Sequence, residues 1–239
     1  MTVVESAQRF GAAQRTRRTT RWVALVVVVA LVALGVWVVW FSSLLAVTEV
    51  RVLGAVDVSA ESVRQAAAVP ARIPLARVDV AGIEQRVGAM PRVASVEVRR
   101  GWPDVLVLVV TERTPIAVTR DGASWTYLDV TGARFGTVNA VPAGMPKVSA
   151  ANDNALASAL GVYAALPRTL ATRVSTVAAT SRDDVVLTLA DGTTVQWGNP
   201  DESERKAAVL QSLLKVKATS YDVSAPDLPT TQGTGKAKP

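Results

Sequence analysis

The longest apolar stretch of the chain lies near its N-terminus. Twenty consecutive residues, Trp22 to Phe41, carry no charged side chain, and as a helix rising about 1.5 Å per residue they span roughly 30 Å, the thickness of the hydrocarbon core of a bilayer. The many valines disfavour a helix in water, but a bilayer offers the backbone no other hydrogen-bond partners. The pattern predicts a transmembrane helix over 22–43, with Trp22, Trp37 and Trp40 as interfacial anchors.

A cleaved signal peptide is the alternative for the same segment. The apolar run exceeds the about 7 to 15 residues usual for such peptides, and cleavage after Ala46 would require a small residue where Leu44 stands. We therefore expect a retained anchor.

Beyond the anchor, residues 47–56 alternate apolar and polar positions and predict a half-buried strand. Ser59 caps a short helix, and Asp79 caps a second helix that ends at Pro91. Residues 91–115, PRVASVEVRRGWPDVLVLVVTERTP, predict two strands joined by a Gly-Trp-Pro-Asp corner. The expected order is strand, helix, helix, strand, strand.

A second group of elements follows without a flexible linker. Over 116–198, short strands with glycine corners surround one helix at 152–166. Asn199 at the cap, Pro200 in the first position and Glu202 in a capping box then predict the start of another helix.

The end of the chain shows a helix, a strand and a polar tail. The apolar side of the helix carries Leu210, Leu213 and Leu214. Residues 218–225 are expected to form the last strand, with Tyr221 and Val223 on one face, stopped by the proline that follows. The remaining residues are polar and are expected to be disordered.

Together these patterns predict an α+β chain with a single N-terminal transmembrane helix, a β-α-α-β-β domain and a second β-rich α+β domain. The expected divisions are a cytoplasmic basic tail at 1–21, the transmembrane helix at 22–43, the first domain at 45–114, the second at 115–226 and a disordered tail at 227–239.

Composition removes several classes of chemistry. The chain has no Cys and no His, so thiolate and imidazole nucleophiles, disulfides and nearly all zinc or copper sites are excluded. We found no calcium loop and no phosphate-binding loop, and we expect no cofactor, no metal and no small-molecule substrate.

The positive charge is concentrated in the N-terminal tail. Residues 1–41 hold five arginines and one glutamate, which account for most of the net charge of +6. This placement argues against nucleic-acid binding by the rest of the chain. It also keeps the N-terminus in the cytoplasm and the bulk of the chain outside it. The arginines nearest the helix are Arg15, Arg17, Arg18 and Arg21.

The order of elements over 45–114, joined to a single membrane helix, resembles the POTRA domain of the bacterial cell-division family FtsQ, also called DivIB. The phrases that carry the resemblance are VTEVRVLGAVDVS and MPRVASVEVRRGWPDVLVLVVTERTPIAV. The resemblance extends from the arginine-rich tail to about Pro229. It implies a single-pass type II protein of the division septum, and a non-enzymatic scaffold that recruits and regulates septal wall synthesis.

The resemblance also implies partners. In that family the last strand of the second domain, with the helix before it, docks the small bitopic protein FtsB, which comes paired with FtsL. The implied partner-binding residues here are Leu210, Leu213, Leu214, Ser220, Tyr221, Asp222, Val223, Ser224 and Ala225. Pro226 and Pro229 interrupt the family's strand pattern, and no aromatic residue follows Tyr221.

Two other functions remain open. The first is an exported membrane-anchored enzyme, for which Ser212 with Lys215 or Asp183 with Asp184 would supply the chemistry. These residues lack companion motifs, and a helix edge and a strand corner explain them as well. The second is a chaperone-like POTRA protein, although such proteins carry several modules and a barrel.

Overall fold

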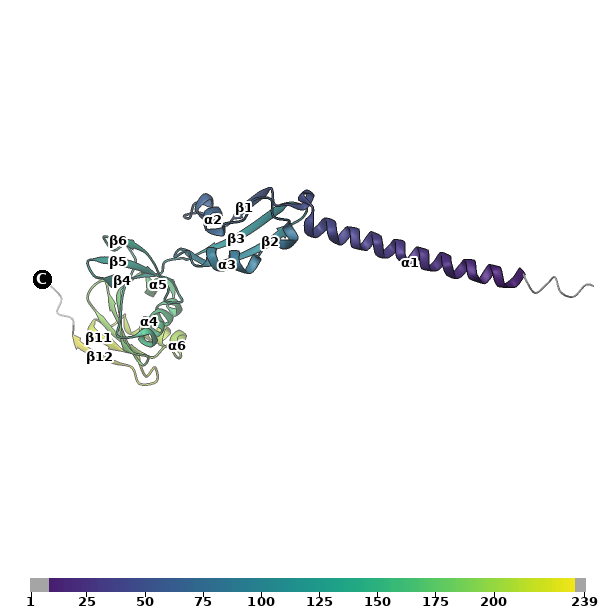
Figure 1. Ribbon diagram of the computed structural model, residues 1–239. Helices are drawn as coiled ribbons and strands as arrows, with labels where there is room; N and C mark the ends of the chain where they lie inside the picture. Colours follow the sequence, from purple (N-terminus) through teal and green to yellow (C-terminus); the bar gives the residue numbers. More distant parts are fainter. Residues whose placement is uncertain (1–8, 235–239) are drawn as a thin grey trace, which may run out of the picture. The chain divides into compact units, whose positions relative to one another are not determined.

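The computed structural model describes residues 9–234, which belong to two compact units, Met1–Glu112 and Arg113–Pro239 (Figure 1). Unit 1 begins with helix α1 (Arg9–Phe41). Its segment Trp22–Phe41 is long and apolar enough to cross a membrane, and the side chains of Trp22, Trp37 and Trp40 are exposed. The predicted apolar helix is confirmed. The side chains of Arg15, Arg17, Arg18 and Arg21 lie outside the described part of the chain.

The remainder of unit 1 is a small sheet with two helices. A 3-10 turn η1 (Ser43–Leu45) leads into the sheet elements. These are β1 (Glu49–Leu53), α2 (Ala60–Ala67), the 3-10 turn η2 (Leu75–Arg77), α3 (Val80–Gly88), β2 (Val93–Gly101) and β3 (Val105–Glu112). The central strand β3 pairs in parallel with β1 and antiparallel with β2. The predicted β-α-α-β-β order is confirmed.

Both helices of unit 1 begin at the cap residues that the sequence predicts. Ser59 Oγ accepts the backbone N–H of Ser62, and Asp79 Oδ1 accepts that of Gly82, so both helices begin at their expected caps. Along β3 the residues alternate, and Leu106 and Leu108 are fully buried in the core that α2 and α3 share.

Unit 2 is built on one large sheet. Its strands are β4 (Ala117–Asp121), β5 (Ser124–Leu128), β6 (Arg134–Val138), β7 (Lys147–Ala150), β8 (Val174–Ser181), β9 (Asp184–Leu189), β10 (Thr194–Gly198), β11 (Ala218–Asp222) and β12 (Thr230–Thr234). Within the described residues their order is β12-β11-β10-β9-β8-β7-β4-β5-β6, so β12 and β6 are the two edges. The second domain is β-rich, as predicted.

Three helices accompany this sheet: α4 (Asp153–Ala165), α5 (Arg168–Ala171) and α6 (Ser203–Leu213). They contribute to one core, in which Trp197 of β10 and Leu160 of α4 are fully buried. Asn152 Oδ1 accepts the N–H of Ala155 and caps α4 at its N-terminus.

Helix α6 begins later than its sequence signals predict. Its first residue is Ser203 instead of Pro200, and Glu202 precedes it with a φ of 53° and no side-chain cap. Asn199 instead forms a turn ahead of the helix, because its Oδ1 accepts the N–H of Asp201. The buried ammonium of Lys206 donates to the carbonyl oxygen and to Oδ1 of Asn199, at 2.9 and 2.8 Å, and ties this turn to α6.

The C-terminal tail also differs from the prediction. Strand β11 ends at Asp222, and the chain returns as β12 over Thr230–Thr234, part of the segment expected to be disordered. Pairing with β11 orders these polar residues, because the strand gains backbone hydrogen bonds without needing apolar side chains. Residues 235–239 lie outside the described part.

Candidate protein-docking surface

The strand expected to dock a partner, β11, lies inside the sheet. It pairs in parallel with β10, with Val195 opposite Tyr221, and antiparallel with β12, with Thr231 opposite Tyr221. Its backbone groups are thus engaged on both sides. A partner strand cannot add to β11 while β12 is in place.

The residues of this segment that were expected to contact a partner divide by face. Tyr221 of β11 is 4% exposed and Val223, just beyond the strand, is fully buried, because alternate residues of this extended segment turn toward the core. The Tyr221 hydroxyl donates to the carbonyl oxygen of Val216, and the backbone N–H of Val223 donates to that of Gln196. Both side chains thus pack in the core of unit 2, and the partner contact that the resemblance implies for them stays a prediction.

The leucines at the end of α6 also pack toward the core. Leu210 is 1% exposed and belongs to the core, while Leu213 and Leu214 are partly buried against it. The apolar stripe of α6 therefore supports the sheet from its covered side.

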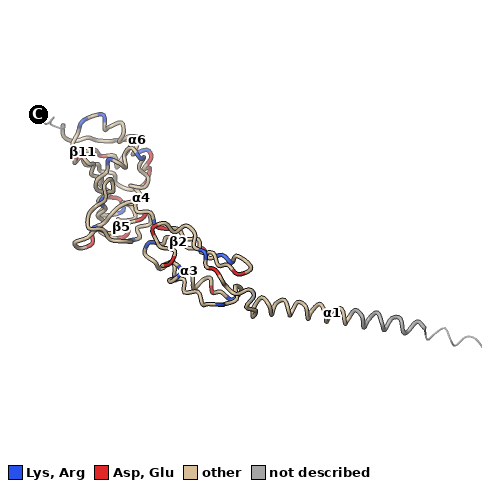
Figure 2. The backbone as a smooth tube through the Cα atoms, turned by 90° about the horizontal axis from the view of Figure 1, so that it is seen from above, with Lys and Arg blue, Asp and Glu red and all other residues tan. Residues whose placement is uncertain are grey.

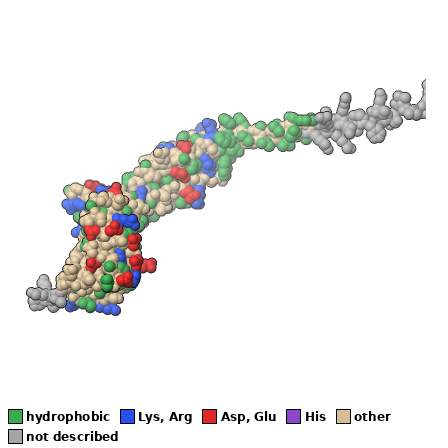
Figure 3. Space-filling model, turned by 90° about the horizontal axis from the view of Figure 1, so that it is seen from below, with side chains coloured by type: hydrophobic (Ala, Val, Ile, Leu, Met, Phe, Trp, Pro, Cys, Tyr) green, Lys and Arg blue, Asp and Glu red, His purple; other side chains and the backbone are tan. Residues whose placement is uncertain are grey.

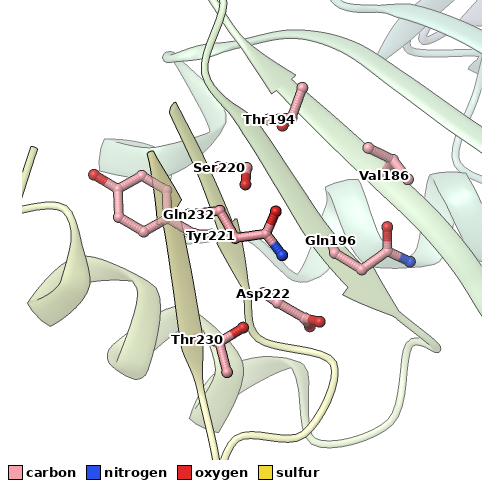
Figure 4. Close-up of a pocket in the computed structure, with 8 residues that line it drawn as sticks. All are labelled: Val186, Thr194, Gln196, Ser220, Tyr221, Asp222, Thr230 and Gln232. Carbon is pink, nitrogen blue, oxygen red and sulfur yellow. The ribbon is translucent and has the colours of Figure 1, made fainter. Parts of the chain in front are cut away.

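The opposite face of the same strands is open and polar. Ser220 and Asp222 lie there beside Gln196 and Thr230, around a hollow of about 300 Å³, whereas Tyr221 points the other way (Figure 4). The lining residues are Val186, Thr194, Gln196, Ser220, Tyr221, Asp222, Thr230 and Gln232. Three strands that form the hollow are β10, β11 and β12. All three lie within the last 46 residues of the chain, 194–239.

Acidic groups border this hollow. Gln196 Nε2 donates to Asp184 Oδ1 at 2.8 Å, and the Thr180 hydroxyl donates to the other carboxylate oxygen. Both hydrogen bonds lower the pKa of Asp184, and the bond from Thr180 has the larger effect. The carboxylate is therefore kept ionised. Asp222 Oδ1 accepts both the N–H and the hydroxyl of Ser224, at 2.9 and 2.7 Å. The surface is therefore acidic, and the turn that carries exposed Ser224 and Ala225 is held by Asp222.

Strand β12 forms the outer edge of this surface. Residues 230–233 are exposed, and no strand in the described part of the chain pairs with the side of β12 away from β11. Gly233 has a φ of 73°, and a Cβ there would come within 2.3 Å of Thr219 Oγ1, so the strand is fitted closely to β11. The sequence signal for this strand is the threonine-rich run TTQGT, because β-branched residues favour strands. Pro226 and Pro229, just before the run, argued against a strand there.

The residues considered for catalysis have ordinary structural partners. Ser212 Oγ donates to the carbonyl oxygen of Ala208 one turn earlier on α6. Asp183 lies in the β8–β9 turn, where its N–H donates to Ser181 Oγ. Within residues 9–234, no three His, Cys, Asp or Glu side chains gather as a metal site would require.

Comparison with known proteins accounts for both units. Residues 45–113 match the POTRA domain model, FtsQ-type, and residues 117–228 match the model of the cell division protein FtsQ/DivIB C-terminal domain. A cell division protein FtsQ from Streptomyces venezuelae is 38% identical over 212 residues, covering 83% of this chain and 78% of its own. A cell division protein FtsQ from Mycolicibacterium smegmatis is 39% identical over 198 residues, covering 81% of this chain and 59% of its own.

A solved structure also matches in part. It is the major extracytoplasmic domain of the trans isomer of the cell division protein DivIB from Geobacillus stearothermophilus. The match covers 44% of this chain and 97% of that domain, with 21% identity and a TM-score of 0.35, which is too low to inform the fold.

Proposed function

Because the chain belongs to the FtsQ/DivIB family of bacterial cell-division proteins, we propose that it is a non-enzymatic scaffold of the division machinery. In this role it captures small bitopic membrane proteins of the FtsB and FtsL type at the edge of its large sheet. Through them it recruits and regulates septal wall synthesis.

The free edge of β12 is the observation that supports this proposal. An edge strand presents a row of N–H and C=O groups that an extended segment of another chain can pair with, which adds a strand to the sheet. Backbone pairing supplies most of the affinity, so the polar sequence of Thr230–Thr234 is no obstacle. The docking strand is thus β12, and β11 is the next strand of the sheet.

The sequence-predicted residues that remain accessible supply side-chain contacts. Ser220 and Asp222 line the hollow beside β12, and Ser224 and Ala225 lie exposed in the following turn. With Asp184 ionised at the border, this surface favours a partner segment that carries Lys or Arg close to its pairing strand.

We further propose that the chain is a single-pass type II protein of the plasma membrane at the division septum. The segment Trp22–Phe41 is its anchor, and the arginines before it hold the N-terminus in the cytoplasm. Both units then lie outside the cytoplasm, where wall synthesis takes place. Binding shifts the populations of partner states, and no bond is broken.

Two proline variants at opposite edges of the sheet test the docking strand. Thr231→Pro removes an N–H from β12, and Thr137→Pro does the same in β6, the other edge. Both threonines are exposed. We expect purified FtsB-type ectodomain to lose at least about tenfold in affinity for the first variant, about 1.4 kcal/mol, and to bind the second normally. Unchanged binding to Thr231→Pro would remove β12 from the interface.

A further inference from the structure

The point where α1 ends fixes the level of the membrane surface on unit 1. The apolar segment stops at Phe41, and the chain reaches β1 at Glu49 after the short turn η1. Along the way Val47 N–H donates to the carbonyl oxygen of Ile73, and Thr48 N–H donates to that of Asp104, each at 2.9 Å. The connection between membrane helix and sheet is therefore short and tied down.

Those two hydrogen bonds bring two loops beside the connection. The first is the loop 71–78, which contains η2, and the second is the β2–β3 turn, residues 102–104. The Thr48 hydroxyl also donates to Asp104 Oδ2 at 2.6 Å. Arg100, in β2 just before the turn, holds the first loop against this strand, because its guanidinium donates to the carbonyl oxygens of Leu75 and Val78 at 3.0 and 2.8 Å. We call these two loops the membrane-proximal end of unit 1.

The side chains on this end have the character of an interfacial surface. The Arg77 guanidinium lies 5.8 Å from the centre of the Phe41 ring, the last ring of the apolar segment. Arg72 and Arg77 are exposed and form no ion pair within the described residues. Trp102, at the tip of the β2–β3 turn, is 54% exposed.

The colouring of the surface agrees with these contacts. Basic side chains, which in unit 1 are all arginines, lie next to the hydrophobic helix (Figure 3), and the backbone view places several basic positions in the loops there (Figure 2). Elsewhere in the described part of unit 1, Arg51 and Arg99 pair with Glu49 and Glu97, and Arg64 and Arg92 also have acidic partners. Among these residues four exposed arginines form no ion pair: Arg72, Arg77 and Arg100 lie in or next to the membrane-proximal end, and Arg86 on α3 donates to the carbonyl oxygen of Ala67.

We propose that the membrane-proximal end of unit 1 docks on the phospholipid headgroups of the leaflet from which α1 emerges. Arg77 contacts the final ring of an apolar segment of bilayer length, so its guanidinium lies at the level of the lipid phosphates. Arginines at this level attract anionic headgroups, and exposed tryptophan is favoured at the interface. This inference rests on the proposed membrane anchoring but on no division partner.

The absence of cysteine allows a direct test on the full chain. Ala71→Cys in the loop before Arg72 and Val56→Cys, which is 87% exposed beyond the other end of β1, accept one fluorophore each. The labelled chain is reconstituted in vesicles of phosphatidylglycerol and phosphatidylcholine that carry a quencher on the headgroup. We expect several-fold stronger quenching at position 71 than at position 56.

The contributions of the two arginine charges and of the tryptophan ring are then tested in the Ala71→Cys variant. The double variant Arg72→Glu and Arg77→Glu, and separately Trp102→Ser, should reduce quenching at position 71 and leave circular dichroism unchanged. Equal quenching at positions 71 and 56, or no response to the substitutions, would overturn the proposal.

The docking and anchoring hypotheses fail differently in this experiment. If the chain does not float with the vesicles, the anchoring itself fails. If it floats and position 71 is not quenched, only the docking fails. Binding of FtsB-type ectodomain to the same samples reports on the β12 edge independently.

Discussion

Glu112 and Arg113 are consecutive residues, and each forms its polar contacts within a different unit. The Glu112 carboxylate accepts the backbone N–H groups of Val56, Asp57 and Val58, at 2.7 to 3.1 Å. Arg113 donates to Asp129 at 2.6 Å in a pair that is mostly buried. Each residue therefore has its polar partners inside its own unit.

Glu112→Ala should loosen the loop that the carboxylate holds. Three backbone N–H groups lose an ionised acceptor, at a cost of about 1–3 kcal/mol in the stability of unit 1. Amide hydrogen exchange at residues 56–58 measures the effect, and it should accelerate there first. Glu61→Ala, which removes an exposed pair with Arg64, is the matched control and should change stability by less than about 0.5 kcal/mol. Unchanged exchange at 56–58 would contradict this role of Glu112.

Asp129 should make unit 2 sensitive to acid. Burial alone would raise the pKa of Asp129, but hydrogen bonds from the Thr131 hydroxyl, Arg113 and the N–H groups of Ala133 and Thr131 outweigh burial and lower it. Its ionised form thus stabilises the fold above about pH 4, the ordinary value for aspartate. This stabilisation is lost as the pH falls through the lower pKa of the folded protein.

Urea unfolding between neutral pH and about pH 3 measures that dependence. Asp129→Asn should lower stability at neutral pH and flatten the decline in acid. Asp183→Asn, an exposed turn residue, should leave the profile unchanged. A wild-type profile from Asp129→Asn would show that the Arg113–Asp129 pair does not stabilise unit 2.

Tyr221→Asp and Val223→Asp should unfold unit 2. Both side chains lie in the core, and burial of an unpaired charge there costs at least about 3 kcal/mol. Thermal melting by circular dichroism tests this. Ser220→Asp, on the open face of the same strand, should melt close to wild type. If Tyr221→Asp melts normally, β11 does not have the inward face assigned to it.

The sequence predicted unit 1 well because its signals are local. The caps Ser59 and Asp79 act within one helical turn, and the alternation along β3 assigns Leu106 and Leu108 to the core without further information. The apolar length of α1 is likewise evident from consecutive residues.

The missed features depend on contacts between distant residues. Strand β12 has no apolar alternation and is ordered by pairing with β11. Ahead of α6, Asn199 forms a turn with Asp201 and accepts from the more distant Lys206, a pair of contacts that the helix-cap pattern does not include. Alternation placed Tyr221 and Val223 on one face but could not show that α6 and the core cover that face.

Depletion of the protein should leave cells growing but unable to complete septa, because a scaffold is needed for assembly and not for wall chemistry in general. Microscopy of a conditional strain measures cell length and septum number. A strain that carries Thr137→Pro should divide normally, and one that carries Thr231→Pro should elongate. Normal division after clean deletion, without a redundant copy, would contradict the proposed role.

Site-specific photo-cross-linking in dividing cells tests the docking strand most directly. A cross-linking residue is placed at Thr230, Thr231 or Gln232 in β12, and at Thr137 in β6 as the control edge. The account predicts adducts with an FtsB-type bitopic partner from β12 and none from β6. Adducts from β6 alone, or none from β12 while the partner co-purifies with the protein, would contradict it.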